Sequence, residues 1–329
     1  MADSVLHFAS FDYDHTRALT DGRVKVPSAE IRHVELHPVA TFQRMLEKRE
    51  FEIAEMALTC YLISLDRGAS PFVALPVFPV RAFRHGAIFV RVGGRVNEPK
   101  DLIGKRVGEF LAYGGDAGTW AKGILADEYG VPHDSYSYAI GGIGMKSGPL
   151  SWMPNLAPPN IRVEHIGAQR TLDEMLEMGE LDAVIGPHAP PSMMRREGKV
   201  RRLFENYEEV ERGWFRKTRI FPIMHTLVMR RDVYEANRGL ARALYDAFKE
   251  AKDIALQRYR DVGHIRFGIP WMTPHLDTVA ELMGPDWWPY GAEANRPTLE
   301  AFARYHHQHG LSRRRIPIEE MFAPETLAV

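Results

Sequence analysis

Cysteine is almost missing from this chain, which has one, Cys60, in 329 residues. A single thiol cannot close an internal disulfide, so the fold depends on its core, and a chain of this length can bury a large one. Long hydrophobic runs are missing as well. The best candidate, residues 56–65, is interrupted by Thr59 and Ser64, and it is much shorter than the ~20 apolar residues that span a bilayer. We therefore predict no membrane partner.

An excess of either charge is also lacking. Lys and Arg together number 42 and Asp and Glu 43, which gives a net charge of −1. Without a basic field that attracts phosphates, the chain is not predicted to bind nucleic acid. Its first residues have neither the basic start nor the apolar stretch of a secretion signal. The lone cysteine suits a reducing compartment, and we therefore expect a cytoplasmic protein.

Signatures of the common organic cofactors are not found. The turn at residues 114–119 lacks the Gly-Lys-Ser/Thr ending of a phosphate loop. Residues 142–144 do not complete a dinucleotide fingerprint. The histidines of residues 306–309 lack the spacing of a zinc site and are predicted to lie at the surface. We expect no organic cofactor. Asp12, Asp14 and His15 form a further group of possible metal ligands, and a divalent metal ion held by residues distant in sequence stays open.

What the chain does have is a regular alternation of short apolar runs and amphipathic segments. At ~150 residues per domain, its length suggests about two domains. The pattern predicts strands at residues 5–9, 31–36, 51–56, 72–78, 87–92, 105–108, 161–165, 181–185 and 221–229. It predicts helices at residues 41–49, 119–129, 171–178 and 233–259. This alternation is typical of an α/β fold with largely parallel sheets.

An internal repeat supports two lobes. Residues 41–55 and 171–185 are identical at five of fifteen aligned positions, and each segment is predicted to be a helix, a tight turn and a buried strand. Chance similarity between amphipathic helices is the alternative explanation. A true repeat predicts two lobes of similar topology, with loops at the carboxyl ends of strands, where open α/β sheets bind ligands.

Several stretches spread over most of the chain carry a resemblance to a known family. They are Asp12–Leu19 with Asp21–Val24, Pro76–His85, Asp101–Gly108, Gly179–Pro187, Phe221–His225, and Glu281–Gly284 with Tyr290–Gly291 and Asn295–Arg296. Through them the chain resembles the 4,5-dihydroxyphthalate decarboxylase family, an offshoot of the type II periplasmic binding-protein fold. It departs from the family pattern in the predicted loops at residues 55–59 and 109–116 and at His188. The resemblance therefore predicts the fold more firmly than it predicts the exact substrate.

The resemblance implies a two-lobed α/β fold with a central cleft and a two-stranded hinge. We assign residues 1–100 and 226–329 to lobe 1 and residues 101–225 to lobe 2. It also implies a carboxy-lyase that acts without oxidation on a hydroxylated aromatic carboxylate, by protonation of the ring followed by loss of CO2. The expected partner is a small aromatic carboxylate in the catabolism of aromatic compounds such as phthalates. Assembly into a homo-oligomer is left open.

This reaction requires that the substrate anion is held and that the ring carbon is protonated. Arg81 and Arg84 suit the first task, because a guanidinium binds a carboxylate through two parallel hydrogen bonds. With 32 Arg against 10 Lys, a pair of surface arginines is the alternative. His85 and His188 are the candidate proton donors, since imidazole titrates near neutrality. A histidine packed for structural reasons is the alternative for His85.

Further site residues are predicted from segments expected at the cleft. Asp14 is a third catalytic candidate that could orient a histidine, accept a substrate hydroxyl or bind metal, and an ordinary helix N-cap is its alternative. Predicted substrate contacts, besides the two arginines, are Arg17, Glu55, Thr59, Tyr113, Gly114 and His225. For His225, which lies in an apolar strand, a place in the core is the alternative.

Two other functions stay open. A non-catalytic protein that captures a small anion between its lobes would use the same fold, and function cannot be read from a fold. A different lyase or a hydrolase in the same cleft is the third hypothesis, because the predicted loops depart from the family pattern.

Overall fold

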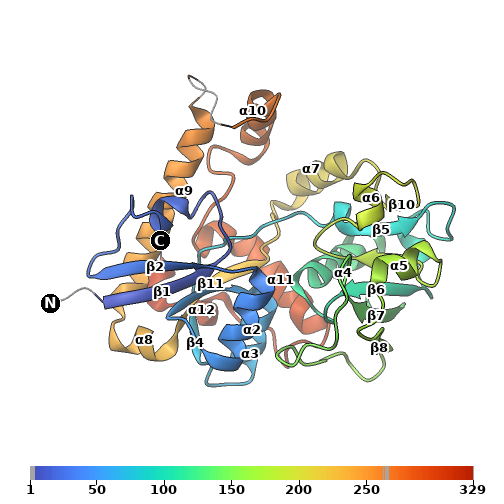
Figure 1. Cartoon of the computed structure of the whole chain (residues 1–329), viewed down its shortest axis with the longest axis horizontal. Coiled ribbons are helices and arrows are strands. Elements are labelled where there is room, and N and C mark those ends of the chain that lie inside the picture. Colours follow the sequence, from blue (N-terminus) through green and yellow to red (C-terminus); the bar gives the residue numbers. More distant parts are fainter. Residues whose placement is uncertain (1–3, 262, 264–266, 329) are drawn as a thin grey trace. The chain divides into compact units, whose positions relative to one another are not determined.

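The computed structural model describes residues 4–261, 263 and 267–328, and it divides into two compact units (Figure 1). Unit 1 consists of Met1–Arg81, His225–Leu299 and Ile316–Val329. Unit 2 consists of Ala82–Met224 and Glu300–Arg315. At the first crossing point, the backbone N–H of His225 donates to Val80 O (3.3 Å) and that of Ala82 donates to Pro222 O (3.1 Å).

Unit 1 is built on a five-stranded sheet with the order β2-β1-β3-β11-β4. Its strands are β1 (Ser4–Ser10), β2 (Ala29–Glu35), β3 (Ile53–Ala57), β4 (Phe72–Leu75) and β11 (His225–Arg230). β1 is parallel to β2 and β3, whereas β11 is antiparallel to β3 and β4. The central strand β3 is buried along its whole length, as expected for a strand with neighbours on both sides and cover on both faces.

Several helices of unit 1 pack on this sheet. The helices of the unit are α1 (Arg17–Thr20), α2 (Pro38–Lys48), α3 (Leu58–Asp66), α8 (Arg231–Ala236), α9 (Gly239–Arg260), α10 (Met272–Met283) and α12 (Ile318–Met321), with 3-10 turns η3 (Glu293–Asn295) and η4 (Pro324–Thr326). α10 has no buried residue. α9 packs on one face, where the rings of Phe248 and Phe8 meet edge to face at 5.1 Å. α2 packs near the start of β11 through Phe42, whose ring lies 5.0 Å from that of His225.

Unit 2 has a six-stranded sheet with the order β10-β5-β9-β6-β7-β8. Its strands are β5 (Ile88–Arg91), β6 (Arg106–Phe110), β7 (Ser137–Gly141), β8 (Val163–His165), β9 (Ala183–Ile185) and β10 (Val200–Arg202). Its helices are α4 (Asp116–Tyr129), α5 (Leu172–Glu177), α6 (Pro191–Met194) and α7 (Tyr207–Thr218), with 3-10 turns η1 (His85–Ala87) and η2 (Pro99–Leu102). α11 (Arg296–Gln308) begins in unit 1 and continues into unit 2.

The core of unit 2 lies on both faces of its sheet. Alternate residues of one strand belong to different hydrophobic clusters: Ile88 and Val90 pack into one cluster, and Phe89 packs into the other. The same alternation places Ala183 and Ile185 in the first cluster and Val184 in the second. This period of two is the geometry of a strand, and it explains why these strands read as continuous apolar runs in the sequence.

The two sheets share one topology. Strands β1, β2, β3, β11 and β4 of unit 1 correspond in order and direction to β6, β7, β9, β5 and β10 of unit 2. The repeated segments of the sequence form α2 with β3 in one unit and α5 with β9 in the other. The helix, turn and strand predicted for each copy of the repeat are therefore present.

The bounds of the units differ from the predicted lobes. The sequence assigns residues 1–100 to lobe 1, but β5 pairs with β9 and β10, so the segment from Ala82 onward belongs to unit 2. Glu300–Arg315 also belongs to unit 2, whereas the sequence places it in lobe 1. Two local predictions are wrong as well. The predicted loop at residues 55–59 is the end of β3 followed by α3, and the predicted helix at residues 233–259 is broken between α8 and α9 at Asn237.

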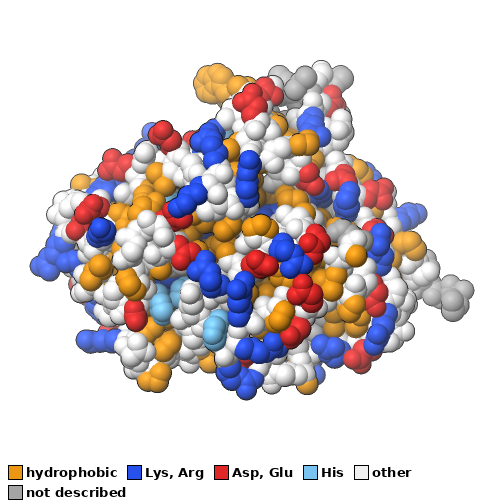
Figure 2. Space-filling view, turned by 180° about the vertical axis from the view of Figure 1, so that it is seen from behind, with side chains coloured by type: hydrophobic (Ala, Val, Ile, Leu, Met, Phe, Trp, Pro, Cys, Tyr) orange, Lys and Arg blue, Asp and Glu red, His pale blue; other side chains and the backbone are white. Residues whose placement is uncertain are grey.

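The surface carries both charges. On the face drawn in Figure 2, basic and acidic side chains are interspersed, which agrees with the nearly balanced composition. Among the described helices, none combines the length and the apolar character needed to cross a membrane.

Candidate functional site

A buried carboxylate is the centre of a cluster in unit 1. Glu55 lies in β3 and its side chain is 0% exposed. Its Oε1 accepts a hydrogen bond from the Tyr13 hydroxyl (2.6 Å) and lies 2.5 Å from His225 Nδ1. Its Oε2 accepts a hydrogen bond from the backbone N–H of Phe11 (3.2 Å). These donors compensate the burial of a charge in an otherwise apolar strand.

The topology of the sheet brings these residues together. Tyr13 follows β1, which is the parallel neighbour of β3. His225 is the first residue of β11 and lies opposite Ala57, two residues beyond Glu55, so that His225 and Glu55 form a diagonal cross-strand pair on one face. With the carboxylate at Nδ1, that nitrogen carries the proton, and Nε2 is the position left for acid–base chemistry. The imidazole is 15% exposed.

A second dyad adjoins the first cluster through Tyr13. Asp14 Oδ1 accepts a hydrogen bond from the backbone N–H of His15 (2.8 Å) and lies 3.0 Å from His15 Nδ1. Burial acts to raise the pKa of Asp14, but the contacts with His15 outweigh it and lower that pKa below its ordinary value. The His15 ring lies 5.5 Å from that of Tyr13, 5.3 Å from that of Trp288 and 6.4 Å from that of Tyr290.

Arg81 is a buried cation of the same unit. It is 6% exposed, and its Nη1 donates to Pro289 O at 3.0 Å. Burial lowers the pKa of Arg81 to about 9, against the opposing attraction of Asp286 and Tyr290. The guanidinium therefore keeps its charge at neutral pH. Arg81 is thus not an ordinary surface arginine.

The other predicted residues of unit 1 are less central. Arg17 is exposed, and its Nε donates to Asp12 Oδ1 at 3.2 Å, so its charge is paired at the surface. Thr59 is completely buried in the first turn of α3. The structure therefore brings Glu55 and His225 into direct contact. Asp14 directly follows Tyr13, which bonds Glu55, and Arg17 lies exposed at the surface.

Two predicted residues of unit 2 are buried near its first helix. Arg84 is 5% exposed, and its Nε donates to Met224 Sδ at 3.3 Å. Burial lowers the pKa of Arg84 to about 10, opposed by Asp116 and Glu211. His85 is 1% exposed, and burial lowers its pKa to about 4. Three aromatic rings surround its imidazole edge-on, those of Tyr129, Phe204 and Trp214.

The remaining predicted residues of unit 2 lie apart from His85. His188 is exposed, and its Nε2 lies 3.2 Å from Ile143 O. The Tyr113 hydroxyl donates to His309 O at 3.1 Å, and Gly114 N–H donates to Glu109 Oε1 at 2.9 Å. Both positions therefore take part in the internal bonding of unit 2.

A buried ion pair in unit 2 was not among the predicted features. Lys122 Nζ in α4 lies 2.9 Å from Glu109 Oε2 in β6, and both side chains are almost completely buried. The Tyr113 ring packs 3.8 Å from the ammonium nitrogen. Since Glu109 also holds the backbone of Gly114, the pair fixes the turn that precedes α4. Spacing did not indicate it, because Glu109 and Lys122 lie on a strand and a helix separated by a loop.

Tyr13 was also missed as a site residue, and His15 was considered only as a possible metal ligand. Both lie inside the stretch Asp12–Leu19, so their position in a segment that follows a strand was the available signal. The histidines of residues 306–309 were predicted at the surface, and this is wrong for two of them: His306 and His309 are buried. Within the described ranges, no group of three or more His, Cys, Asp or Glu side chains is placed to hold a metal ion.

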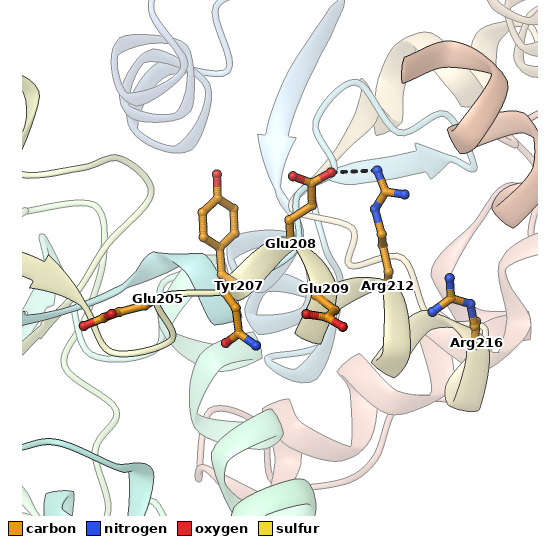
Figure 3. Close-up of a pocket in the computed structure, with 7 residues that line it drawn as sticks. Glu205, Tyr207, Glu208, Glu209, Arg212 and Arg216 are labelled. Atoms are coloured by element: carbon orange, nitrogen blue, oxygen red, sulfur yellow. Dashed lines mark hydrogen bonds and ion pairs between the residues drawn. The ribbon is translucent and has the colours of Figure 1, made fainter. Parts of the chain in front are cut away.

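A surface groove occurs elsewhere in unit 2, at the start of α7 (Figure 3). It is lined by Glu205, Asn206, Tyr207, Glu208, Glu209, Arg212 and Arg216. Glu208 and Arg212 form an ion pair across one turn (2.6 Å). The groove contains none of the predicted site residues, and we assign no function to it.

Comparison with known proteins identifies close relatives in sequence. No family model matches the chain. It is 33% identical over 327 residues to the 4,5-dihydroxyphthalate decarboxylase of Comamonas testosteroni, covering 99% of this chain and 98% of that protein. It is 32% identical over 211 residues to the 4,5-dihydroxyphthalate decarboxylase of Pseudomonas putida, covering 64% of this chain and 81% of that protein.

Solved structures confirm the predicted fold class. The periplasmic aliphatic sulphonate-binding protein SsuA of Escherichia coli matches with a TM-score of 0.56 and 13% identity, covering 98% of each chain. The sulfonate-binding SsuA of Methylobacillus flagellatus matches with a TM-score of 0.57 and 12% identity, covering 98% of this chain and 92% of that one. A Candida albicans protein with the generic periplasmic binding-protein fold matches with a TM-score of 0.53 and 12% identity, covering 98% and 97%. The chain therefore has a fold like that of periplasmic binding proteins.

Proposed function

Because the chain belongs to the 4,5-dihydroxyphthalate decarboxylase family, we propose that it removes CO2 from a hydroxylated aromatic carboxylate of the 4,5-dihydroxyphthalate type. Both curated relatives are decarboxylases, and the chain is accordingly a carboxy-lyase. Its proposed partner is a small aromatic dicarboxylate or monocarboxylate that carries ring hydroxyls.

The proposed reaction needs no oxidant. A proton is added to the ring carbon that bears the leaving carboxylate, which interrupts the aromatic system. The bond between that carbon and the carboxylate then breaks, and its electron pair restores the ring as CO2 leaves. The net change is the replacement of CO2 by a proton, which the donor recovers from solvent. The protein must therefore supply an oriented proton donor and a site for the anion.

The contact between Glu55 and His225 is the observation that carries the assignment of the donor. Glu55 is buried, it lies 2.5 Å from His225 Nδ1, and it also accepts the Tyr13 hydroxyl. A carboxylate in this position orients the imidazole and stabilises its protonated form. We therefore assign proton delivery to His225 and the positioning of its ring to Glu55. Tyr13 and Phe11 hold Glu55 in turn.

The other candidates suit different roles. His85 is enclosed by aromatic rings with its pKa lowered to about 4, which favours a neutral, packed imidazole. His188 has no carboxylate among its recorded contacts, and its catalytic role stays a prediction. Arg81, a buried guanidinium that keeps its charge, is the proposed holder of a substrate carboxylate. Arg84 as a second holder and a divalent ion as a cofactor also stay predictions.

The direct test measures CO2 from 4,5-dihydroxyphthalate and from a panel of hydroxybenzoates, with added divalent metal and with a chelator. We expect turnover by the wild type, a strong loss in His225→Gln, and activity close to wild type in the exposed control His7→Gln. His7 also lies 3.0 Å from a glutamate, Glu52, but at the surface. Tight binding of these acids without any CO2 would contradict a decarboxylase and establish the non-catalytic anion-binding protein.

A further inference from the structure

Among the buried polar atoms of unit 1 that lack a hydrogen-bond partner within the described residues are two on neighbouring rings, His15 Nε2 and the Tyr290 hydroxyl, with ring centroids 6.4 Å apart. His15 is 8% exposed and Tyr290 is 5% exposed. A buried polar atom without a partner costs free energy, and such atoms in folded proteins are almost always paired with protein, water or ligand. The pair of atoms therefore points to a group that binds there.

The hydrogen-bonding character of the two atoms defines this group. Asp14 Oδ1 lies 3.0 Å from His15 Nδ1, so Nδ1 carries the proton and Nε2 presents a lone pair. Burial raises the pKa of Tyr290 well above its ordinary value, which keeps its O–H as a donor. One atom accepts and the other donates. A hydroxyl group satisfies both, because it donates its own proton and accepts another.

The surroundings suit a hydroxyl on an aromatic ring. The rings of Tyr13 and Trp288 lie 5.5 and 5.3 Å from that of His15, and the Phe78 ring lies 6.5 Å from that of Tyr290. Such flat apolar faces pack against a flat ligand. The site lies close to the surface, since the Asp14 side chain is 45% exposed and Trp288 is half-buried.

The charges around the site favour an ionised oxygen. The Tyr290 side chain interacts electrostatically with Arg81, and also with Asp14 and Asp286. Asp14 is engaged by His15, and Asp286 forms a 2.6 Å ion pair with Lys252. Arg81 donates to the carbonyl oxygen of Pro289, and its positive charge lowers the pKa of Tyr290 against the effect of burial, so it also favours an ionised oxygen at this position.

We propose that His15 and Tyr290 form a subsite for a ring hydroxyl of the substrate, which rests on the proposed function and deepens it. The O–H bond of the substrate breaks, its proton moves to His15 Nε2, and the electron pair stays on the ring oxygen. Electron density from that oxygen makes the ring carbon easier to protonate. After CO2 leaves, His15 returns the proton to the oxygen. Asp14 is a positioning residue that stabilises the imidazolium, and Tyr290 donates to the oxygen throughout.

The test compares ligands that differ only in their hydroxyls. Calorimetry measures the Kd of 3,4-dihydroxybenzoate, which lacks the second carboxylate of dihydroxyphthalate, against that of benzoate. It also measures the Kd of 4,5-dihydroxyphthalate against that of phthalate, in each case at short times. The variants are His15→Asn, which keeps a donor for Asp14 but removes Nε2, and Tyr290→Phe. His15→Gln is the conservative replacement. Matched controls are His7→Asn at the surface and Tyr245→Phe, another buried tyrosine of unit 1.

We expect the wild type to prefer each hydroxylated ligand, and each site variant to reduce that preference by about tenfold or more. Affinity for benzoate and phthalate should stay within about twofold, His15→Gln should recover part of the preference, and the controls should keep it. The Asp14→Asn variant should weaken the same preference, which a merely structural role would not do selectively. Circular dichroism and thermal unfolding establish that each variant is folded.

Several outcomes overturn the proposal. An unchanged preference in both site variants would mean that the two atoms hold a buried water only. Equal weakening of hydroxylated and plain ligands would mean a structural role, and failure of the wild type to bind or distinguish any of the ligands would also contradict the subsite. The proposed function is judged separately by CO2 release. A hydroxyl preference that is lost in the variants of a protein without turnover would support the subsite and refute the decarboxylase.

Discussion

Replacing Glu55 by glutamine tests the proposed proton donor with the smallest change in shape. The carboxylate receives the Tyr13 hydroxyl, the Phe11 N–H and the His225 ring nitrogen. The amide keeps one acceptor oxygen but loses the charge that favours a protonated imidazole. A hydrogen bond to a charged group contributes about 1.5–3 kcal/mol. If the bond to His225 is worth this much in the transition state, kcat/KM should fall by roughly 10- to 150-fold.

The assay is CO2 release under conditions where substrate concentration is varied. We expect the loss in kcat, with KM nearly unchanged, because Glu55 acts through His225 rather than by touching the substrate. Glu52→Gln is the matched control, since Glu52 contacts His7 at 3.0 Å on the surface. Activity of a folded Glu55→Gln variant within about threefold of wild type would refute the reasoning, because the charge would then contribute less than ~1 kcal/mol.

A double-mutant cycle adds a second criterion to this prediction. If Glu55 acts through the imidazole, its replacement should cost little in a His225→Gln background, because residues that work as a unit are not additive. Additive losses in the double variant would contradict a shared role. Thermal unfolding of all three variants separates an effect on catalysis from an effect on stability.

Three further predictions concern unit 2. Lys122→Met should destabilise the protein by about 3–5 kcal/mol because it leaves Glu109 charged and buried. Denaturant unfolding should show that the double variant Lys122→Met, Glu109→Leu regains stability, and an unchanged stability of Lys122→Met alone would contradict this. Gly118→Ala should cost about 1–3 kcal/mol, since its Cβ would lie 1.9 Å from Glu109 Oε1; an unchanged unfolding midpoint would count against it. His85 has a pKa lowered to about 4, so the unfolded chain binds its proton first, and stability should fall by up to about 3 kcal/mol as pH drops from about 6.5 to 4. Unfolding at pH 7 and pH 4.5 should show a smaller loss in His85→Phe, and an equal loss would refute the assignment.

The sequence predicted the fold because its signals are local and repeated. The apolar runs that form β3 and β9 each follow an amphipathic helix, and this unit can be recognised twice without knowing any tertiary contact. The family stretches then set the class. The boundary between the units was harder to place, because β5 pairs with β9 and β10, which lie about a hundred residues further along the chain, and nothing in the sequence near residue 100 records that pairing.

The site was only partly predictable for a related reason. Glu55 and His225 were both expected at the site, but their contact depends on β11 entering the sheet antiparallel between β3 and β4, and they lie 170 residues apart. Tyr13 was overlooked because its proposed role is to bond Glu55 Oε1, the same oxygen that contacts His225. His85 illustrates the opposite case. Its place beside Arg84 suggested chemistry, whereas its environment is set by the rings of Tyr129, Phe204 and Trp214, which no spacing rule connects to it.

The internal repeat bears on our proposal that the acid–base chemistry belongs to unit 1. Glu55 aligns with Ile185 in the repeated segments, so the same helix, turn and strand carry a carboxylate in one unit and an apolar side chain in the other. One buried carboxylate of unit 2, Glu109, lies on the strand next to Ile185 and is neutralised by Lys122 at 2.9 Å. A carboxylate bound to a buried ammonium stabilises structure but cannot orient an imidazole, whereas Glu55 contacts a tyrosine, a backbone amide and a partly exposed histidine. The two related sheets therefore carry buried acids with different partners, and of these two acids Glu55 contacts the histidine to which we assign proton delivery.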